Sequence, residues 1–82
     1  MNIEEKIIEI VRQNLAQDKR FALITPQTNL LEELGIDSFA TLMIANDIED
    51  EFDISISREM IAGTKNVAEI AEKLKSNFPE IG

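Results

Sequence analysis

One serine in the middle of the chain stands where its hydroxyl could take part in chemistry. Ser38 follows Asp37 in the stretch ELGIDSFATL, where a loop containing Gly35 passes directly into an apolar run. A side-chain oxygen at a helix start can accept free amide hydrogens of the first turn, so either residue could be the helix cap. If Asp37 is the cap, the Ser38 hydroxyl is free to point outward. A phosphate ester there would be favoured by the partial positive charge of the helix N-terminus. The residues alone leave both roles open, a cap and an attachment point.

Other reactive side chains are scarce in this sequence. The 82 residues include no cysteine and no histidine, which excludes a thiolate nucleophile, a disulfide framework, the usual zinc sites and the commonest general base. A domain of this size is also too small for a deep catalytic cleft, so we do not expect an enzyme. The acidic run Asp47–Asp53 lacks the residue order of a calcium-binding loop, and we expect no metal site.

The negative charge is concentrated in the middle of the chain. The net charge is −8, and residues 30–62 hold nine acids and one base, Arg58, whereas the flanks are balanced. This charge argues against a nucleic-acid ligand and would steer a basic partner towards one side of the molecule. A solvated acidic face without a partner is the alternative.

Two sequence features that would place a protein at a membrane are missing. No apolar run approaches the roughly 18 residues that a membrane span needs, and no basic-then-apolar leader is present. We therefore expect a soluble cytoplasmic protein.

Helix signals occupy both ends of the chain. Asn2 is placed to cap a first helix whose apolar residues recur at helical spacing to about Ala16. Asn66 is placed to cap a last amphipathic helix, which Pro79 should stop. A long connection, residues 18–37, follows the first helix, and Asn29 within it could cap a single helical turn, LLEEL.

A second long helix is predicted from Ser38 to about Glu51. Its apolar residues cover more than one narrow stripe, so it should contact several neighbours or a partner. An extended connector, DISIS, leads to a short helix capped by Ser57 and ended by Gly63. We predict an all-α fold, an antiparallel four-helix bundle with three long helices, one short helix and a long first loop. Residues 1–82 should form one domain.

The segment LGIDSFATLMIANDIEDEFDISIS resembles the signature of the acyl carrier protein family. The helix order, the long first loop and the short third helix extend this resemblance over nearly all of the chain. It implies that a phosphopantetheinyl transferase moves 4′-phosphopantetheine from coenzyme A onto Ser38, with Asp37 as helix cap and transferase contact. The thiol of this arm would then hold acyl groups as thioesters. A chain without cysteine needs such a borrowed thiol.

The resemblance also raises the question of where the acyl chain lies while it is attached to the arm. Apolar residues of the bundle could shelter an acyl chain between enzymes, although they are core residues first. The residues that we assign to this interior are Leu42, Ile48, Phe52, Ile56, Ile61 and Ile70.

The second helix departs from the pattern of family members that serve fatty acid synthesis. Those members carry acids two and five residues after the serine, where this chain has Ala40 and Met43. An exposed ion pair is worth about 0.2–1 kcal/mol, so losing two should weaken contacts with basic enzymes several-fold. We predict a partner-binding face that combines apolar residues with later acids, and a specialised carrier for a dedicated lipid, polyketide or nonribosomal peptide pathway. The face comprises Phe39, Ala40, Met43, Asp47, Glu49 and Asp50.

Two other interpretations remain open at this point. The chain could be a peptidyl carrier whose arm bears aminoacyl groups. It could also be an unmodified acidic helical interaction domain in which Ser38 is only a cap. In each case we expect a monomer that acts through enzyme or protein partners.

Overall fold

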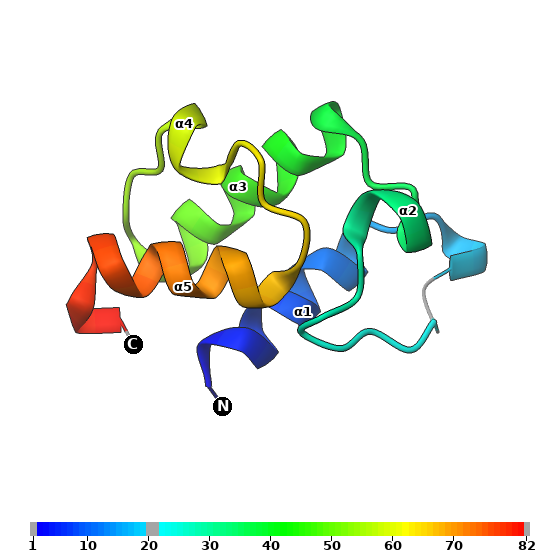
Figure 1. The fold of residues 1–82 in the computed structure, drawn as a ribbon, viewed down its shortest axis with the longest axis horizontal. Coiled ribbons are helices and arrows are strands. Elements are labelled where there is room, and N and C mark those ends of the chain that lie inside the picture. Colours follow the sequence, from blue (N-terminus) through cyan, green and yellow to red (C-terminus); the bar gives the residue numbers. More distant parts are fainter. Residues whose placement is uncertain (1, 20–21, 82) are drawn as a thin grey trace.

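The computed structural model describes residues 2–19 and 22–81, and every regular element within them is a helix. The elements are α1 (Ile3–Gln13), α2 (Leu30–Leu34), α3 (Ser38–Phe52), α4 (Arg58–Ile61) and α5 (Val67–Asn77), with 3₁₀ turns at Gln17–Lys19 and Pro79–Ile81 (Figure 1). The all-α prediction is confirmed.

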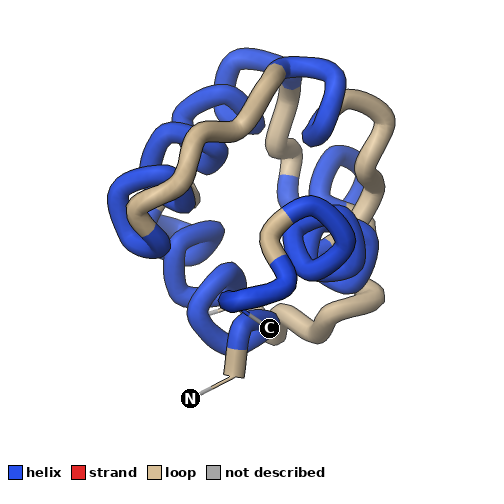
Figure 2. The backbone as a smooth tube through the Cα atoms, turned by 90° about the vertical axis from the view of Figure 1, so that its left-hand side faces the viewer, coloured by secondary structure: helices blue, strands red, loops and turns tan. Residues whose placement is uncertain are grey.

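The three long helices form a bundle that the two short helices complete. In Figure 1, α3 and α5 run from right to left and α1 runs in the opposite direction. Helix α1 packs against both α3 and α5, and α4 also packs against both of them. Figure 2, seen from the side, shows the helices and loops arranged around a common centre. The predicted helical bundle is therefore present, and the turn LLEEL is an additional short helix.

The helices begin where side-chain caps satisfy their first amide groups. The side chains of Asn2, Asn29, Ser57 and Asn66 each accept a hydrogen bond from the amide three residues further on. These caps were predicted from the sequence because a cap depends on a few neighbouring residues.

Helix α1 ends at Gln13, earlier than the predicted end at about Ala16. The Asn14 side-chain amide donates to the Ile10 carbonyl at 2.8 Å and to the Asp47 carboxylate on α3 at 2.9 Å. Asparagine side chains compete with the helical hydrogen-bond pattern, and here the competing partner lies 33 residues away in sequence. The helix therefore stops where a tertiary contact holds its end.

A second tie joins the same two helices about one turn further along α3, at Glu51. The Lys6 ammonium lies 3.3 Å from the Glu51 carboxylate, and it also lies over the Phe52 ring, 5.7 Å from the ring centroid. Both polar ties between α1 and α3 therefore involve Asp47 and Glu51, which belong to the second half of α3.

The long first loop is fixed by backbone hydrogen bonds to the segment that begins α5. The Leu30 amide donates to the Lys65 carbonyl, and the Ala68 amide donates to the Pro26 carbonyl, both at 2.9 Å. The buried Thr28 hydroxyl accepts the Thr25 amide within the loop. These bonds place α2, and with it the start of α3, against the rest of the bundle.

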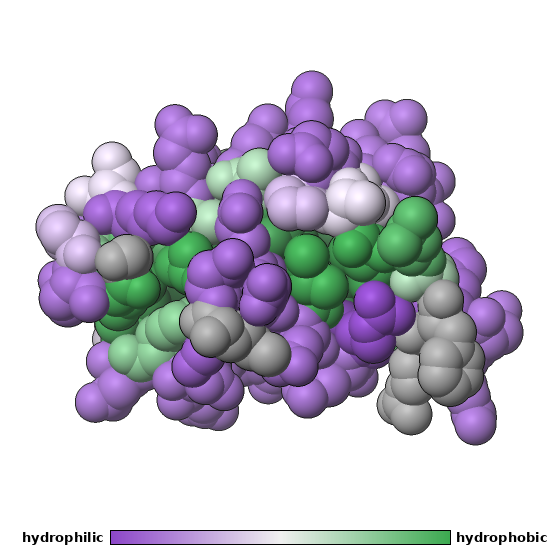
Figure 3. Space-filling view, turned by 90° about the horizontal axis from the view of Figure 1, so that it is seen from below, coloured by the Kyte–Doolittle hydropathy of each residue, from purple (hydrophilic) through white to green (hydrophobic). Residues whose placement is uncertain are grey.

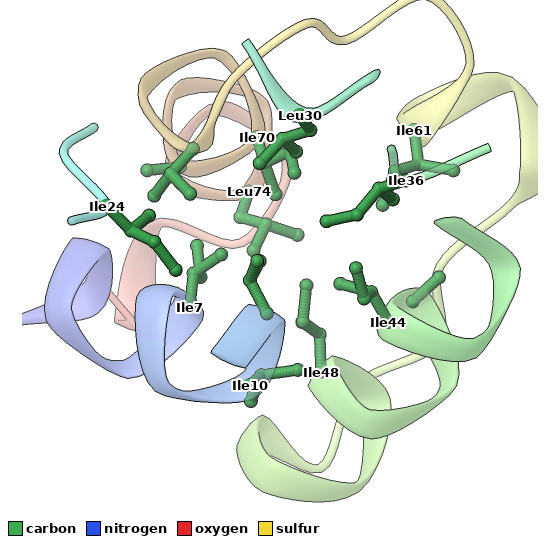
Figure 4. Packing of buried hydrophobic residues seen from close by; sticks show 14 of the residues in the cluster. Ile7, Ile10, Ile24, Leu30, Ile36, Ile44, Ile48, Ile61, Ile70 and Leu74 are labelled. Atoms are coloured by element: carbon green, nitrogen blue, oxygen red, sulfur yellow. The ribbon is translucent and has the colours of Figure 1, made fainter. Parts of the chain in front are cut away.

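The core is built from branched aliphatic side chains that converge from every helix. Figure 4 shows Ile7 and Ile10 of α1 facing Ile44 and Ile48 of α3, with Ile70 and Leu74 of α5 closing the centre. The most completely buried side chains are Ile7, Val11, Ile44, Ile48, Val67 and Leu74. Burying such a side chain contributes about 1.5–3 kcal/mol, so this convergence stabilises the bundle.

Some hydrophobic surface remains on the outside of the molecule. Seen from below, hydrophobic side chains form a band that hydrophilic side chains interrupt near the middle, with hydrophilic margins on either side (Figure 3). Leu23 in the first loop is 86% exposed. Among residues 2–19 and 22–81, no helix combines the length and apolar character needed to cross a membrane.

Candidate functional site

A tight corner between α2 and α3 sets the position of Ser38. Gly35 ends α2 in the left-handed conformation, with φ +70°, a region that glycine adopts without the penalty of a Cβ. The amide of Ile36 then donates to the Leu30 carbonyl at 2.9 Å, and the Ile36 side chain is buried. With the corner anchored in the core on one side, the next two residues, Asp37 and Ser38, lie at the surface.

Asp37, and not Ser38, caps α3. Its Oδ1 accepts the Ala40 amide at 2.9 Å, and its backbone carbonyl accepts the Thr41 hydroxyl at 2.8 Å. Ser38 is the first residue of the helix and is exposed. Within the described part of the chain its hydroxyl makes no hydrogen bond, so this hydroxyl is available for chemistry.

Ser38 lies at the edge of a cleft of about 620 Å³. The cleft is bounded by α2, the first turns of α3, α4 and the loop after α4. Its lining residues are Leu31, Ile36, Asp37, Ser38, Thr41, Leu42, Arg58, Ile61, Ala62, Gly63 and Thr64. A flexible group attached to Ser38 would therefore have a partly apolar surface beside it.

The structure brings only part of the predicted acyl interior to this cleft. Leu42 and Ile61 line it, whereas Ile48 and Ile70 are buried in the packed core. Phe52 and Ile56 are half-buried at the opposite end of α3 and do not line the cleft. The six residues thus do not form one chamber in this structure.

An apolar patch beside Ser38 is formed by Phe39, Leu42 and Met43. These side chains are 72%, 37% and 43% exposed, respectively. Residues three and four apart on a helix share one face, which places all three together. Ala40 is half-buried and packs against the core, so it contributes less to this patch.

The predicted acids of the partner face differ in their surroundings. Asp47 and Glu49 are half-buried, and Asp50 is exposed. Asp47 accepts the Asn14 amide group, and Glu49 Oε2 accepts the Ile56 backbone amide at 2.6 Å. Asp47 and Glu49 therefore help to hold the fold, and Asp50 is the one of the three that is fully available at the surface. Among residues 2–19 and 22–81, no three Asp or Glu side chains lie close enough together to hold a metal ion.

Sequence reasoning did not place Arg58, Leu31, Thr41 or Thr64 at the site. These residues come from α2, α3, α4 and the loop after α4, and they meet only in the folded chain. One signal was nevertheless visible in the sequence, because Arg58 is the single base among the nine acids of residues 30–62.

Comparisons with known proteins assign this chain to a family. The family model described as "Phosphopantetheine attachment site" matches residues 5–74. An acyl carrier protein of Rickettsia bellii is 33% identical, over 93% of this chain and 86% of its own length. The chain belongs to the acyl carrier protein family. An acyl carrier protein of Lactococcus lactis subsp. cremoris is 36% identical, over 94% of this chain and 99% of its own length.

A solved structure agrees with this family assignment. A chain assigned as an acyl carrier protein, from Mycobacterium tuberculosis, superposes with a TM-score of 0.78 at 29% identity, covering 93% of this chain and 99% of its own. As a member of the acyl carrier protein family, the chain carries acyl groups on a covalently attached 4′-phosphopantetheine. A carrier of this kind works with synthase and transferase enzymes.

Proposed function

We propose that Ser38 is the residue to which 4′-phosphopantetheine is attached. The observation that carries the proposal is the division of roles at the start of α3, where Asp37 caps the helix and the Ser38 hydroxyl stays exposed without a hydrogen bond. Esterification of this hydroxyl would therefore disrupt no hydrogen bond within the described part of the protein.

The residues around Ser38 fit the group. The 15-residue helix α3 begins at Ser38, and the partial positive charge of a helix N-terminus favours a phosphodiester at that point. The cleft offers a surface along which the arm can lie. When bound, the arm supplies the thiol that this cysteine-free chain lacks.

We further propose that residues 1–82 act as one non-catalytic carrier domain. The absence of histidine and cysteine supports this, since acyl chemistry would then be performed by partner enzymes. Because the arm is donated by coenzyme A, a cytoplasmic location is proposed for its attachment.

Partner enzymes would contact mainly the first turns of α3, and acids further along the helix would add to this contact. In this proposal, the transferase contacts Asp37 and Phe39, and acyl-using enzymes contact the apolar patch together with Asp50. Ala40, Asp47 and Glu49 complete the face, with smaller contributions because they are half-buried. Two acids are missing relative to carriers of primary fatty acid synthesis, which supports a specialised role.

The attachment proposal is tested by loading the purified protein. Incubation with coenzyme A, magnesium and a promiscuous phosphopantetheinyl transferase should add the mass of one phosphopantetheine. The Ser38→Ala variant should gain nothing, because it has no hydroxyl at this position. Ser57→Ala is the matched control, since Ser57 also sits at a helix start but caps α4.

The outcome separates the proposed carrier from the unmodified domain. Loading that Ser57→Ala retains and Ser38→Ala loses supports attachment at Ser38. A wild-type mass that stays unchanged, or loading that persists in Ser38→Ala, contradicts it.

A further inference from the structure

The cleft beside Ser38 holds one positive charge in the most acidic part of the chain. Arg58 is the only base among residues 30–62, and it lines the same cleft as Ser38 and Asp37. Its placement therefore brings a lone cation next to the proposed attachment point.

Nothing in the described residues uses the Arg58 guanidinium. It is exposed, and across residues 2–19 and 22–81 it makes no hydrogen bond, ion pair or ring contact. It does not form an ion pair even with Asp37, although both line the cleft. Arg58 is also the first residue of α4, where the helix dipole disfavours a cation. Its charge thus gives the fold no visible stabilisation.

Arg58 is the one charged hydrogen-bond donor among the side chains of the cleft, and the two threonine hydroxyls are already used as donors elsewhere. The Thr41 hydroxyl donates to the Asp37 carbonyl, and the Thr64 hydroxyl donates to the Ile61 carbonyl. Each threonine hydroxyl has a single hydrogen, so both can only accept further bonds. Among the side chains of the cleft, Arg58 is consequently the one that can donate hydrogen bonds to an anion attached at Ser38.

We propose that Arg58 binds an anionic group carried by the arm on Ser38. This inference rests on the proposed attachment at Ser38. Two parts of a loaded arm could supply the charge, namely the phosphodiester at its root and a carboxylate on a dicarboxylic cargo such as a malonyl group. A planar guanidinium matches both, because it can donate two parallel hydrogen bonds to either group.

The experiment compares loaded forms of three proteins by NMR. Wild type, Arg58→Gln and Lys75→Gln are each prepared without the arm, with the arm alone, and with acetyl and malonyl arms. Lys75→Gln is the matched control, because it removes one positive charge from an exposed position outside the cleft. The readouts are the ³¹P shift of the phosphodiester and the backbone amide shifts of residues 58–64. The amide shifts of each loaded form are compared with those of the unloaded form of the same variant. The ³¹P shift exists only when the arm is attached, so it is compared between wild type and the variants in the same loaded form.

The expected result is a loading-induced change at residues 58–64 that depends on Arg58. Arg58→Gln should lower the ratio of docked to free arm by roughly two- to five-fold, as expected for a solvent-screened charge pair. Lys75→Gln should behave like wild type. A ³¹P difference between Arg58→Gln and wild type in every loaded form identifies the phosphodiester as the ligand. An Arg58-dependent change of the amide shifts that is confined to the malonyl form identifies the cargo carboxylate.

Two other outcomes would overturn the inference, and they are distinguishable. If loading occurs but Arg58→Gln and Lys75→Gln give the same shifts in every form, Arg58 binds no part of the arm and the attachment proposal still stands. If mass spectrometry shows no loading of Ser38, the attachment proposal fails and the role of Arg58 fails with it.

Discussion

At the start of α3, two adjacent side chains of similar hydrogen-bonding capacity have separate roles. Asp37 satisfies the Ala40 amide, and Ser38 leaves its hydroxyl in solvent. A cap residue has extended backbone geometry, whereas the next residue is already helical. Asp37 has this extended backbone, with φ −85° and ψ −171°, and it directly precedes the first helical turn. Asp37 is therefore the cap, and Ser38 is not.

This division predicts different stabilities for two alanine variants. Asp37→Ala should lower the free energy of unfolding by about 0.5–2 kcal/mol, the usual cost of a lost cap. Ser38→Ala should change it by less than about 0.5 kcal/mol, because an exposed side chain without partners is removed. Urea unfolding followed by far-UV circular dichroism measures both, and the chain has no tryptophan or tyrosine to serve as a fluorescence probe. Equal losses in the two variants would show that Ser38 shares the capping role.

At the scale of the elements, two acids that the sequence analysis assigned to the partner-binding face, Asp47 and Glu49, instead hold the second half of α3 in place. Glu49 accepts the Ile56 amide and so fixes the connector between α3 and α4. The backbone of Asp53 takes the left-handed conformation at the end of α3, with φ 55°. The Asp53 backbone conformation reverses the chain after α3, and the Glu49 hydrogen bond then holds the connector in place.

Glu49→Ala should therefore loosen this connector. Removing the acceptor leaves the half-buried Ile56 amide unpaired, which typically costs about 1–3 kcal/mol. Hydrogen exchange at the Ile56 amide should accelerate, and the denaturant midpoint should fall. Asp50→Ala is the control, since Asp50 is exposed and should show neither effect. Unchanged exchange at Ile56 in Glu49→Ala would mean that the connector is held by other contacts.

The sequence was sufficient where structure depends on near neighbours. The caps at Asn2, Asn29, Ser57 and Asn66, and the start of α3 at Ser38, each follow from a few consecutive residues. Tertiary partners could not be predicted in the same way. The end of α1 depends on a bond from Asn14 to Asp47, and the roles of Asp47 and Glu49 depend on where the chain returns.

The candidate site shows the same limit. The residues of the apolar patch lie on one predicted helix, so most of the patch could be named from the sequence. The cleft is different, because Leu31, Arg58 and Thr64 reach it from separate elements. Only a folded chain shows that the single base of the acidic segment lies beside Ser38.

At the scale of the whole molecule, charge and apolar surface are unevenly distributed. The net charge of −8 belongs to residues 30–62, and this segment also carries the apolar patch next to Ser38. Such a distribution gives long-range attraction for a basic enzyme, while contact at the patch itself depends on apolar burial.

Restoring acids to the face should broaden the range of enzymes that load the carrier. Ala40→Glu combined with Met43→Glu should raise the kcat/KM of loading enzymes from primary fatty acid synthesis several-fold, at about 0.2–1 kcal/mol per exposed pair. Met43→Glu should contribute more of this gain, because Met43 is exposed and Ala40 is half-buried. The gain should shrink as salt is added, because surface charges are screened. Leu23→Glu is the control, as it places an acid at an exposed apolar position in the first loop. Identical kcat/KM values for the double variant and wild type would contradict the role of the patch.

The two ties from α1 reach only the second half of α3, at Asp47 and Glu51. Within the described residues, the first turns of this helix, residues 38–43, have no hydrogen bond or ion pair to another helix. An enzyme that binds these turns therefore contacts a section of α3 that only side-chain packing holds against the other helices. Each successive enzyme can adjust that section to its own surface without rupturing a polar bond, so one carrier can accommodate catalysts of different shape.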